Sequence, residues 1–231
     1  MIEEPPVLTI VEGAPTPTPE QIAALKGVET AFICDAMGGI AAMSTAIAPL
    51  GLGEELDRHV VGRALVADSG PMDIMATLAA VNLLTPGDVV VHAAHGHGGC
   101  ATIGDQLSGM LKNAGAAAFV TDGPMRDFDG IRATGLPCWC AGLNPNSPYA
   151  NGPGTLGGAA VVGGRQVATG DIIVADRNGV VVIPYARIDA VIAKAKAVAQ
   201  MEKELEVKVK DGFCTPLDID AMLADGRAKK V

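Results

Sequence analysis

Short apolar runs alternate with segments of helical spacing through the middle of the chain. The predicted strands are Val60–Ala67, Asp88–Ala93, Ala116–Thr121 and Pro137–Ala141, and the predicted helices cover residues 71–84, 102–113 and 128–134. Gly115 follows the second helix, at the position where a helix commonly ends. Apolar strands on both sides of a helix are typical of parallel βαβ units, because helices cover both faces of such a sheet. The pattern therefore predicts two consecutive βαβ units.

The pattern changes after Asn144–Gly157, a loop that is rich in Pro, Gly and Asn and long for a compact domain. Short strands then follow one another closely, with glycine turns between them: Ala159–Val162, Gln166–Ala168, Ile172–Ala175 and Val180–Ile183. They predict an antiparallel β-meander. A long helix is expected from Arg187 to about Val209, and a short one between Thr215 and Gly226.

The N-terminal segment, residues 1–17, is rich in Pro and Thr, and we expect an extended arm rather than a packed element. Thr18 is a predicted N-cap, because Pro19 suits the first helical position and Gln21 completes a capping box. That helix should continue to Gly38. The predicted fold class is α/β with flanking helices, divided into the arm at 1–17, one domain at 18–210 and a C-terminal helical tail at 211–231.

Charge and composition exclude several kinds of partner. The chain has 17 Lys+Arg against 26 Asp+Glu, a net charge of −9, and only 3% aromatic residues. Nucleic-acid binding usually needs clustered basic residues and stacking aromatics, so we expect neither nucleic acid nor an anionic membrane as a partner. Disorder is also unexpected, because 49% of the residues are hydrophobic and can offset the loss of chain entropy.

The ends of the chain and the cysteines suggest the compartment. The N-terminus has no basic and apolar signal segment, and the longest uncharged stretch is broken by Pro, Gly and Asn. The cysteines number five, which is odd, and follow no disulfide framework of a small secreted domain. We therefore expect a reduced, cytoplasmic protein.

The candidate chemistry lies between residues 96 and 142. Gly104–Leu107 falls where a loop turns into a helix, so free backbone N–H groups and the helix dipole favour an anion there. Arg126 and Asp127 follow the next predicted strand at its carboxyl end, where ligands collect in open α/β sheets. One βαβ step should therefore bring Asp105, Arg126 and Asp127 to the same edge of the sheet.

These residue types suit one class of chemistry. Two carboxylates with water molecules form an oxygen-only site for Mg²⁺ or Mn²⁺. A neighbouring guanidinium can hold a substrate carboxylate or oxo group in a bidentate way. Together they can polarise a 2-oxo acid and stabilise the enolate that forms when a neighbouring C–C bond breaks. A Schiff-base mechanism has weak support, since the only lysine of this block, Lys112, lies inside the predicted helix.

At these residues the chain resembles a known family. The motif consists of Asp105, a gap of twenty residues and then Arg126-Asp127. It resembles the signature of the class II, metal-dependent 4-hydroxy-4-methyl-2-oxoglutarate/4-carboxy-4-hydroxy-2-oxoadipate aldolases. The fold family of these enzymes includes the RraA-like regulators of ribonuclease E activity. Further matching segments are Val120–Gly123, Gly135–Pro137, Gly170–Asp176 and Gly179–Pro184. The resemblance covers roughly residues 20–210. It implies a swivelling β/β/α fold, assembled as trimers or hexamers with sites between subunits.

The resemblance also implies roles for individual residues. Asp127 would bind the metal directly, Asp105 would hold it through a water molecule, and Arg126 would contact the substrate oxygen at the bond being cleaved. The Gly104 turn, with the backbone amides of Gln106 and Leu107, would bind the pyruvate carboxylate. A neighbouring subunit would contribute an acidic residue, for which Glu202 and Glu204 are the candidates.

Two loops depart from the family pattern. His95–Cys100 replaces an acidic, glycine-containing stretch, and Asn144–Gly157 replaces a short segment, so the acceptor part of the substrate is expected to differ. His95 and His97 are predicted to contact substrate, because loop residues at a rigid edge often bind ligands. A zinc site formed by His92, His95, His97 and Cys100 is an alternative, although this spacing fits no common structural zinc site.

Cys138-Trp139-Cys140 places both thiols on one face of a strand. We interpret them as buried small hydrophobic residues, because the Cys-x-x-Cys spacing of a redox pair is missing.

The expected function is that of a divalent-metal-dependent pyruvate aldolase. It would cleave a 4-hydroxy-2-oxo acid into pyruvate and a second oxo acid, with oxaloacetate decarboxylation as a side activity. One alternative is a non-catalytic regulator that binds an RNA-degradation enzyme through its surface. Another is a different metal-enolate lyase or hydratase on the same scaffold, which the His95–Cys100 loop would favour.

Overall fold

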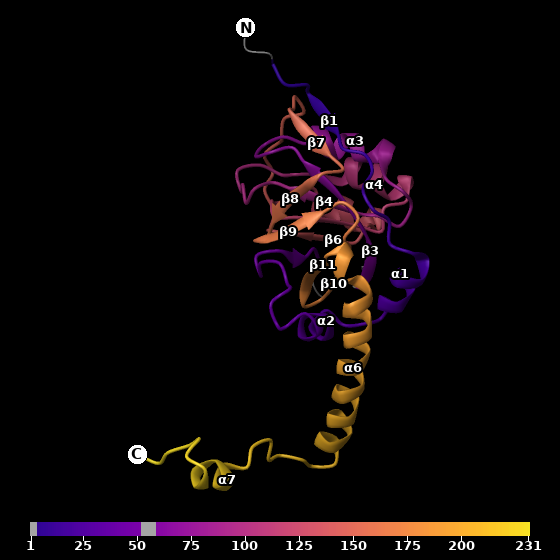
Figure 1. Ribbon diagram of the computed structural model, residues 1–231. Helices are drawn as coiled ribbons and strands as arrows, with labels where there is room; N and C mark the ends of the chain where they lie inside the picture. The colour runs from indigo at the N-terminus through magenta and orange to yellow at the C-terminus, as the bar shows by residue number, and fades with distance from the viewer. Residues whose placement is uncertain (1–3, 52–58) are drawn as a thin grey trace.

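The computed structural model describes residues 4–51 and 59–231, and it shows an α/β fold from which one long helix projects (Figure 1). Residues 1–3 of the predicted arm lie outside the described part. The strands are β1 (Leu8–Ile10), β2 (Ala48–Pro49), β3 (Val60–Asp68), β4 (Val89–Ala93), β5 (Ala118–Thr121), β6 (Cys138–Cys140), β7 (Gly154–Leu156), β8 (Ala159–Val162), β9 (Arg165–Ala168), β10 (Ile172–Asp176) and β11 (Gly179–Ile183). The helices are α1 (Pro19–Leu25), α2 (Thr30–Ala36), α3 (Met75–Leu83), α4 (Asp105–Ala114), α5 (Phe128–Thr134), α6 (Ile188–Lys210) and α7 (Ile219–Ala224), with a 3₁₀ turn at Tyr185–Arg187.

The main sheet has the strand order β1-β7-β3-β4-β5-β6-β2. Strands β3 to β6 are parallel neighbours, with Val66 opposite Val91 and Val91 opposite Val120. α3, α4 and α5 connect them in turn. The two predicted βαβ units are therefore confirmed, and the carboxyl ends of β4, β5 and β6 meet at one edge of the sheet.

Successive side chains of β4 point to opposite faces of the main sheet, and each face packs against a different layer. Val90 packs with α3, α4 and α5 on one face of the sheet. Val89 and Val91 face the other way, toward residues of β8 to β11. The far side of the β10–β11 pair packs against α1, α2 and α6. The order of layers is thus helices, sheet, hairpins and helices, in agreement with the predicted β/β/α arrangement. Aliphatic side chains fill most of the space between these layers.

The predicted meander is divided into two hairpins. β8 and β9 form a separate two-stranded sheet, whereas β10 pairs with β11 and, on its other side, with β3. The chain changes partners at Gly170, whose amide donates to the carbonyl of Ala64 in β3. Gly170 has a φ of +101°, and an added Cβ would lie 2.5 Å from the carbonyl oxygen of Pro15, so glycine is required at this crossing.

The N-terminal part differs from expectation in two respects. Leu8–Ile10 is paired, since β1 runs parallel to β7, itself a strand inside the predicted loop. The predicted first helix is two helices, α1 and α2, which are separated at Gly27 with a φ of +75°. The capping box is confirmed: the Gln21 amide donates to Thr18 Oγ1 and the Thr18 amide donates to Gln21 Oε1.

The helix α6 is packed at its start and exposed at its end. Val191, Ala195 and Val198 are buried in the core cluster or at its margin, but every residue from 201 to 210 is exposed. This second half stands clear of the body, and the tail with α7 continues beyond it (Figure 1). No helix in the described ranges is both long and apolar enough to cross a bilayer.

A test of the β3 packing is Gly62→Ala. An added Cβ would lie 2.4 Å from the Gly87 carbonyl oxygen and 2.9 Å from Val89 Cγ2, so β3 and β4 would have to shift apart. We expect the free energy of unfolding in urea to fall by about 1–3 kcal/mol. Gly98→Ala is the matched control, because nothing lies within 4 Å of its added Cβ. Equal stability of the two variants would contradict this packing.

Candidate active site

Two neighbouring loops form the candidate site at the carboxyl ends of β4 and β5. Thr102 donates both its amide and its hydroxyl to the carbonyl of Pro124, and the Arg126 amide donates to the carbonyl of Ile103. These bonds hold the loop before α4 against the loop before α5. The predicted trio of Asp105, Arg126 and Asp127 therefore lines one pocket of about 220 Å³. Its other lining residues are Ile74, Thr102, Ile103, Gly104, Gln106, Leu107, Ser147 and Pro148.

Two glycines allow the carboxylates to approach the backbone. A Cβ on Gly104 would lie 2.3 Å from Asp127 Oδ2, and a Cβ on Gly130 would lie 2.7 Å from Asp105 Oδ2. Any larger residue at either position would displace a carboxylate. Gly104 was a predicted binding residue, whereas Gly130, inside α5, was not, since its role depends on the approach of α4 to α5.

Arg126 and Asp127 form a partly exposed pair. Arg126 Nε lies 3.3 Å from Asp127 Oδ2, and 36% and 44% of the two side chains are exposed. Arg126 Nη1 also donates to the Ser147 hydroxyl over 2.5 Å. Asp127 precedes α5 with a φ of +58°, a conformation that aspartate tolerates better than most residues and that is common at functional sites.

The start of α4 has the features expected of an anion site, with one modification. Gly104 precedes the helix and supplies no side-chain cap. The Gln106 amide, however, donates to Asp105 Oδ1 at 2.6 Å, so the carboxylate of this chain already uses one of the predicted substrate-binding amides. Roles of Gln106 and Leu107 in substrate binding stay predictions.

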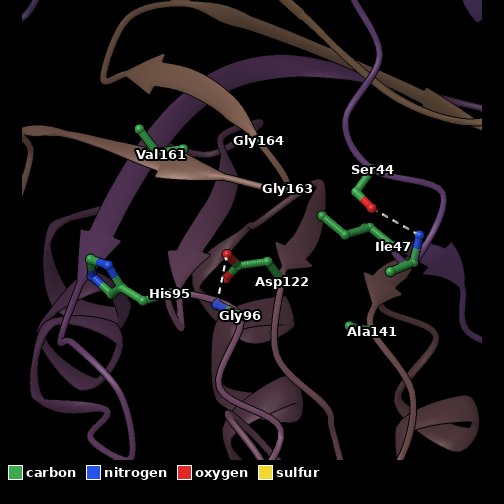
Figure 2. Close-up of a pocket in the computed structure, with 10 residues that line it drawn as sticks. Ser44, Ile47, His95, Gly96, Asp122, Ala141, Val161, Gly163 and Gly164 are labelled. Carbon is green, nitrogen blue, oxygen red and sulfur yellow. Dashed lines mark hydrogen bonds between the residues drawn. The ribbon is translucent and has the colours of Figure 1, made fainter.

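His95 lines a different and larger pocket of about 660 Å³. Figure 2 shows His95 and Asp122 on one side of it, with Val161 of the β8–β9 hairpin opposite and Ile47 beyond. His95 Nε2 pairs with Asp68 Oδ1 at 2.8 Å, and Asp122 accepts from the amides of Ala94 and Gly96. Among the described residues that line this pocket, none is Arg or Lys.

His97 points into the protein. Its Nε2 is buried without a hydrogen-bond partner, and a Cβ on Gly99 would lie 2.5 Å from that atom. His97, His92 and Cys100 border one narrow gap. Within residues 4–51 and 59–231, no three His, Cys, Asp or Glu side chains are grouped so that they could hold a metal by themselves. The structure thus supports no zinc site here, and neither His95 nor His97 is among the residues that line the Asp105 pocket.

Burial changes the acidity of several groups below these loops. His92 is buried with its Nδ1 2.6 Å from Thr77 Oγ1, and burial lowers its pKa to about 4. Cys138 and Cys140 are also buried, and burial raises the pKa of both thiols. The two cysteines therefore stay protonated and act as small core residues, as predicted.

The residues of the smaller pocket fit a hard divalent cation. Asp105 and Asp127 offer only oxygen donors, and Gly104 leaves the space that the Asp127 carboxylate needs. In the described part of the chain these are the only two acidic side chains of the pocket lining, so water or a neighbouring chain would complete the coordination. Mg²⁺ commonly binds in this way, with one or two carboxylates and several waters.

Residues 30–182 match the RraA-like family, described as Aldolase/RraA, and the chain belongs to this family. Among its relatives is a protein of Halalkalibacterium halodurans named "Putative 4-hydroxy-4-methyl-2-oxoglutarate aldolase". It is 34% identical over 175 residues, which cover 76% of this chain and 81% of the relative.

Solved structures show the same fold. RraAS2 of Streptomyces coelicolor, described as an unusual member of the RNase ES inhibitor RraA family, has a TM-score of 0.73 and 26% identity, covering 83% of this chain and 99% of that one. An uncharacterized protein of Pseudomonas syringae pv. tomato has a TM-score of 0.76 and 24% identity, covering 88% and 94%. The predicted fold family is thereby confirmed.

The low pKa of His92 predicts a dependence of stability on pH. Its pKa is 6.5 when exposed and about 4 in the folded protein, so the unfolded chain takes up the proton first as the pH falls. The stabilisation that comes from the neutral, buried His92 is complete above pH 6.5. Between pH 6.5 and 4 the free energy of unfolding falls by about 3 kcal/mol as this stabilisation is lost. Urea unfolding across this range should show a smaller loss for His92→Gln than for wild type. Equal losses would contradict this role.

Proposed function

We propose that the protein is a divalent-metal-dependent pyruvate aldolase. It cleaves a 4-hydroxy-2-oxo acid into pyruvate and a second oxo acid, and decarboxylates oxaloacetate as a side reaction. The observation that carries this proposal is that Asp105, Arg126 and Asp127 line one small pocket. Its volume of about 220 Å³ suits a small acid better than a cofactor or a drug-sized ligand.

The metal would be Mg²⁺ or Mn²⁺. Asp127 would hold it directly and Asp105 through a water molecule. When bound, the cation supplies Lewis-acid polarisation of the 2-oxo group.

Residues of the chain would bind and orient the substrate and accept its proton. Arg126 is partly exposed and can bind the oxygen on C4 of the substrate, where charge develops. The amides at the start of α4 orient the carboxylate of the pyruvate part. Asp105 accepts the proton of the 4-hydroxyl group through a water molecule. The C3–C4 bond then breaks, its electron pair stays on C3, the second oxo acid leaves, and C3 takes a proton from water to give pyruvate.

The comparisons support this reaction and also supply its rival. The name of the Halalkalibacterium relative supports an aldolase, whereas the likeness to RraAS2 of Streptomyces supports a regulator of an RNA-degrading enzyme. A surface regulator has no need of a pocket with two carboxylates and a guanidinium, so the geometry favours the enzyme. A different lyase or hydratase would use the same trio, and the large pocket beside His95 is the feature that favours it.

The activity is tested by coupled detection of pyruvate from a panel of 4-hydroxy-2-oxo acids, with Mg²⁺, with Mn²⁺ and with a chelator. We expect turnover only with metal. Asp127→Asn should lower kcat/KM by on the order of 100-fold or more and weaken Mn²⁺ binding in calorimetry.

The matched control is Asp129→Asn, two residues further on. Its side chain is 93% exposed and is not part of the pocket lining, so activity should stay near wild type. Absence of pyruvate from every substrate with metal present, or activity that persists in the chelator, would overturn the aldolase. Binding of an RNA-degradation enzyme without turnover would favour the regulator.

We also propose that the protein assembles as a homotrimer or homohexamer. Met201, Leu205 and Val209 follow each other at helical spacing on the projecting half of α6, and all three are exposed. Such a stripe is commonly covered by another chain. A neighbouring copy would also bring Glu202 or Glu204, which this helix carries away from the body of its own chain (Figure 1).

The assembly is tested by light scattering during gel filtration. Wild type should have three or six times the chain mass of 23.4 kDa. Leu205→Glu places a charge in the apolar stripe and should shift the mass toward that of one chain. Lys203→Glu changes a charge on the opposite side of the helix and should leave the mass unchanged. A monomeric wild type, or equal effects of the two changes, would contradict the proposal.

A further inference from the structure

The loop between β6 and β7 is fastened at its beginning to the glycine-rich loop after β4. Asn144 Nδ2 donates to the carbonyl of Gly98 at 2.8 Å, and Asn146 Nδ2 donates to that of Gly99 at 2.9 Å. The Ala101 amide returns a bond to the Asn146 carbonyl at 2.9 Å. The Asn144–Gly157 loop is thus tied to the His95–Cys100 loop, and both loops depart from the family pattern.

The other end of the same loop is fastened to the segment before α3. Asp73 Oδ2 accepts from the amides of Asn151 and Gly152, at 2.7 and 3.1 Å. The Tyr149 amide donates to the Met72 carbonyl, and the Ile74 amide donates to the Tyr149 carbonyl. Ser147 lies between these two attachments and lines the Asp105 pocket.

Arg126 lies between Ser147 and Asp127. Nη1 donates to the Ser147 hydroxyl at 2.5 Å, while Nε lies 3.3 Å from Asp127 Oδ2. A guanidinium has five N–H donors in one plane, so these two contacts set its orientation and leave donors for a substrate. A cation held by Asp127 would compete with Arg126 for that carboxylate, whereas the neutral hydroxyl of Ser147 keeps its bond.

We propose that Ser147 is a positioning residue, which holds the guanidinium of Arg126 in the orientation that binds the substrate oxygen at the cleaved bond. The catalytic part of this inference rests on the proposed aldolase function. The orientation itself is a property of the chain and can be measured without a substrate. The loop of residues 144–152 would then form part of the catalytic apparatus through a single hydroxyl group.

The orientation is tested on the full chain with nitrogen-15-labelled arginine. In wild type the N–H groups of Arg126, assigned with Arg126→Lys, should give separate signals, because rotation of the guanidinium is restricted. In Ser147→Ala these signals should merge or broaden, and Ser147→Thr, which keeps the hydroxyl, should restore them. Merged signals in wild type, or separate signals in Ser147→Ala, would overturn the proposal.

Kinetics test the consequence. Ser147→Ala should lower kcat by roughly 10-fold and change KM by less than about twofold, because an oriented guanidinium matters most where charge develops. Ser147→Thr should recover most of the rate. The matched control is Asn146→Ala, which removes a bond from the same loop but does not contact Arg126. It should have the smaller effect, and an equal loss would assign the effect to the loop and overturn the role of Ser147.

The two proposals fail in different ways. If wild type forms no pyruvate with metal present, the aldolase proposal fails, and a signal change in Ser147→Ala still establishes that Ser147 positions Arg126. If wild type is active and Ser147→Ala keeps its rate, the aldolase stands and the catalytic role of Ser147 is wrong.

Discussion

The parallel pairing of β4 with β5 holds the site together. With Val91 opposite Val120, both strands end at the same edge, and the chain leaves each of them through a loop that enters a helix. Hydrogen bonds from Thr102 to Pro124 and from Arg126 to Ile103 then join the two loops. The α3–α5 layer packs on one face of the sheet and the hairpins on the other, so both loops lie at its carboxyl edge. The carboxylates of Asp105 and Asp127 share a pocket as a consequence.

An acidic chain can bind an anionic substrate when charge is arranged locally. The protein has a net charge of −9, and Arg126 is the only basic residue of the described pocket lining. In the proposed enzyme a divalent cation with two carboxylates would be close to neutral, so one guanidinium and the amides at the start of α4 would hold a small carboxylic acid. The acidic excess belongs to residues 1–187, because α6 and the tail carry equal numbers of acidic and basic residues.

The two loops that depart from the family pattern act on the site by different routes. The residues of the His95–Gly99 loop face a second pocket or point inward, toward His92 and Cys100. The loop after β6 crosses to the site and supplies Ser147 and Pro148 to its wall. Both loops are tied to each other by Asn144 and Asn146, so a change in one is expected to move the other.

The sequence by itself determined the α/β class, the βαβ units, the capping box at Thr18 and the trio of Asp105, Arg126 and Asp127, because each depends on local periodicity or on fixed spacing along the chain. Only the tertiary structure decided what depends on contacts between distant segments. β1, β2 and β7 have two or three residues and exist through their partners, and the predicted meander is divided because β3 offers β10 a free edge. Gly130 and Ser147 belong to the site for the same reason: one lies beneath Asp105 and the other against Arg126, although 24 and 20 residues lie between the members of each pair.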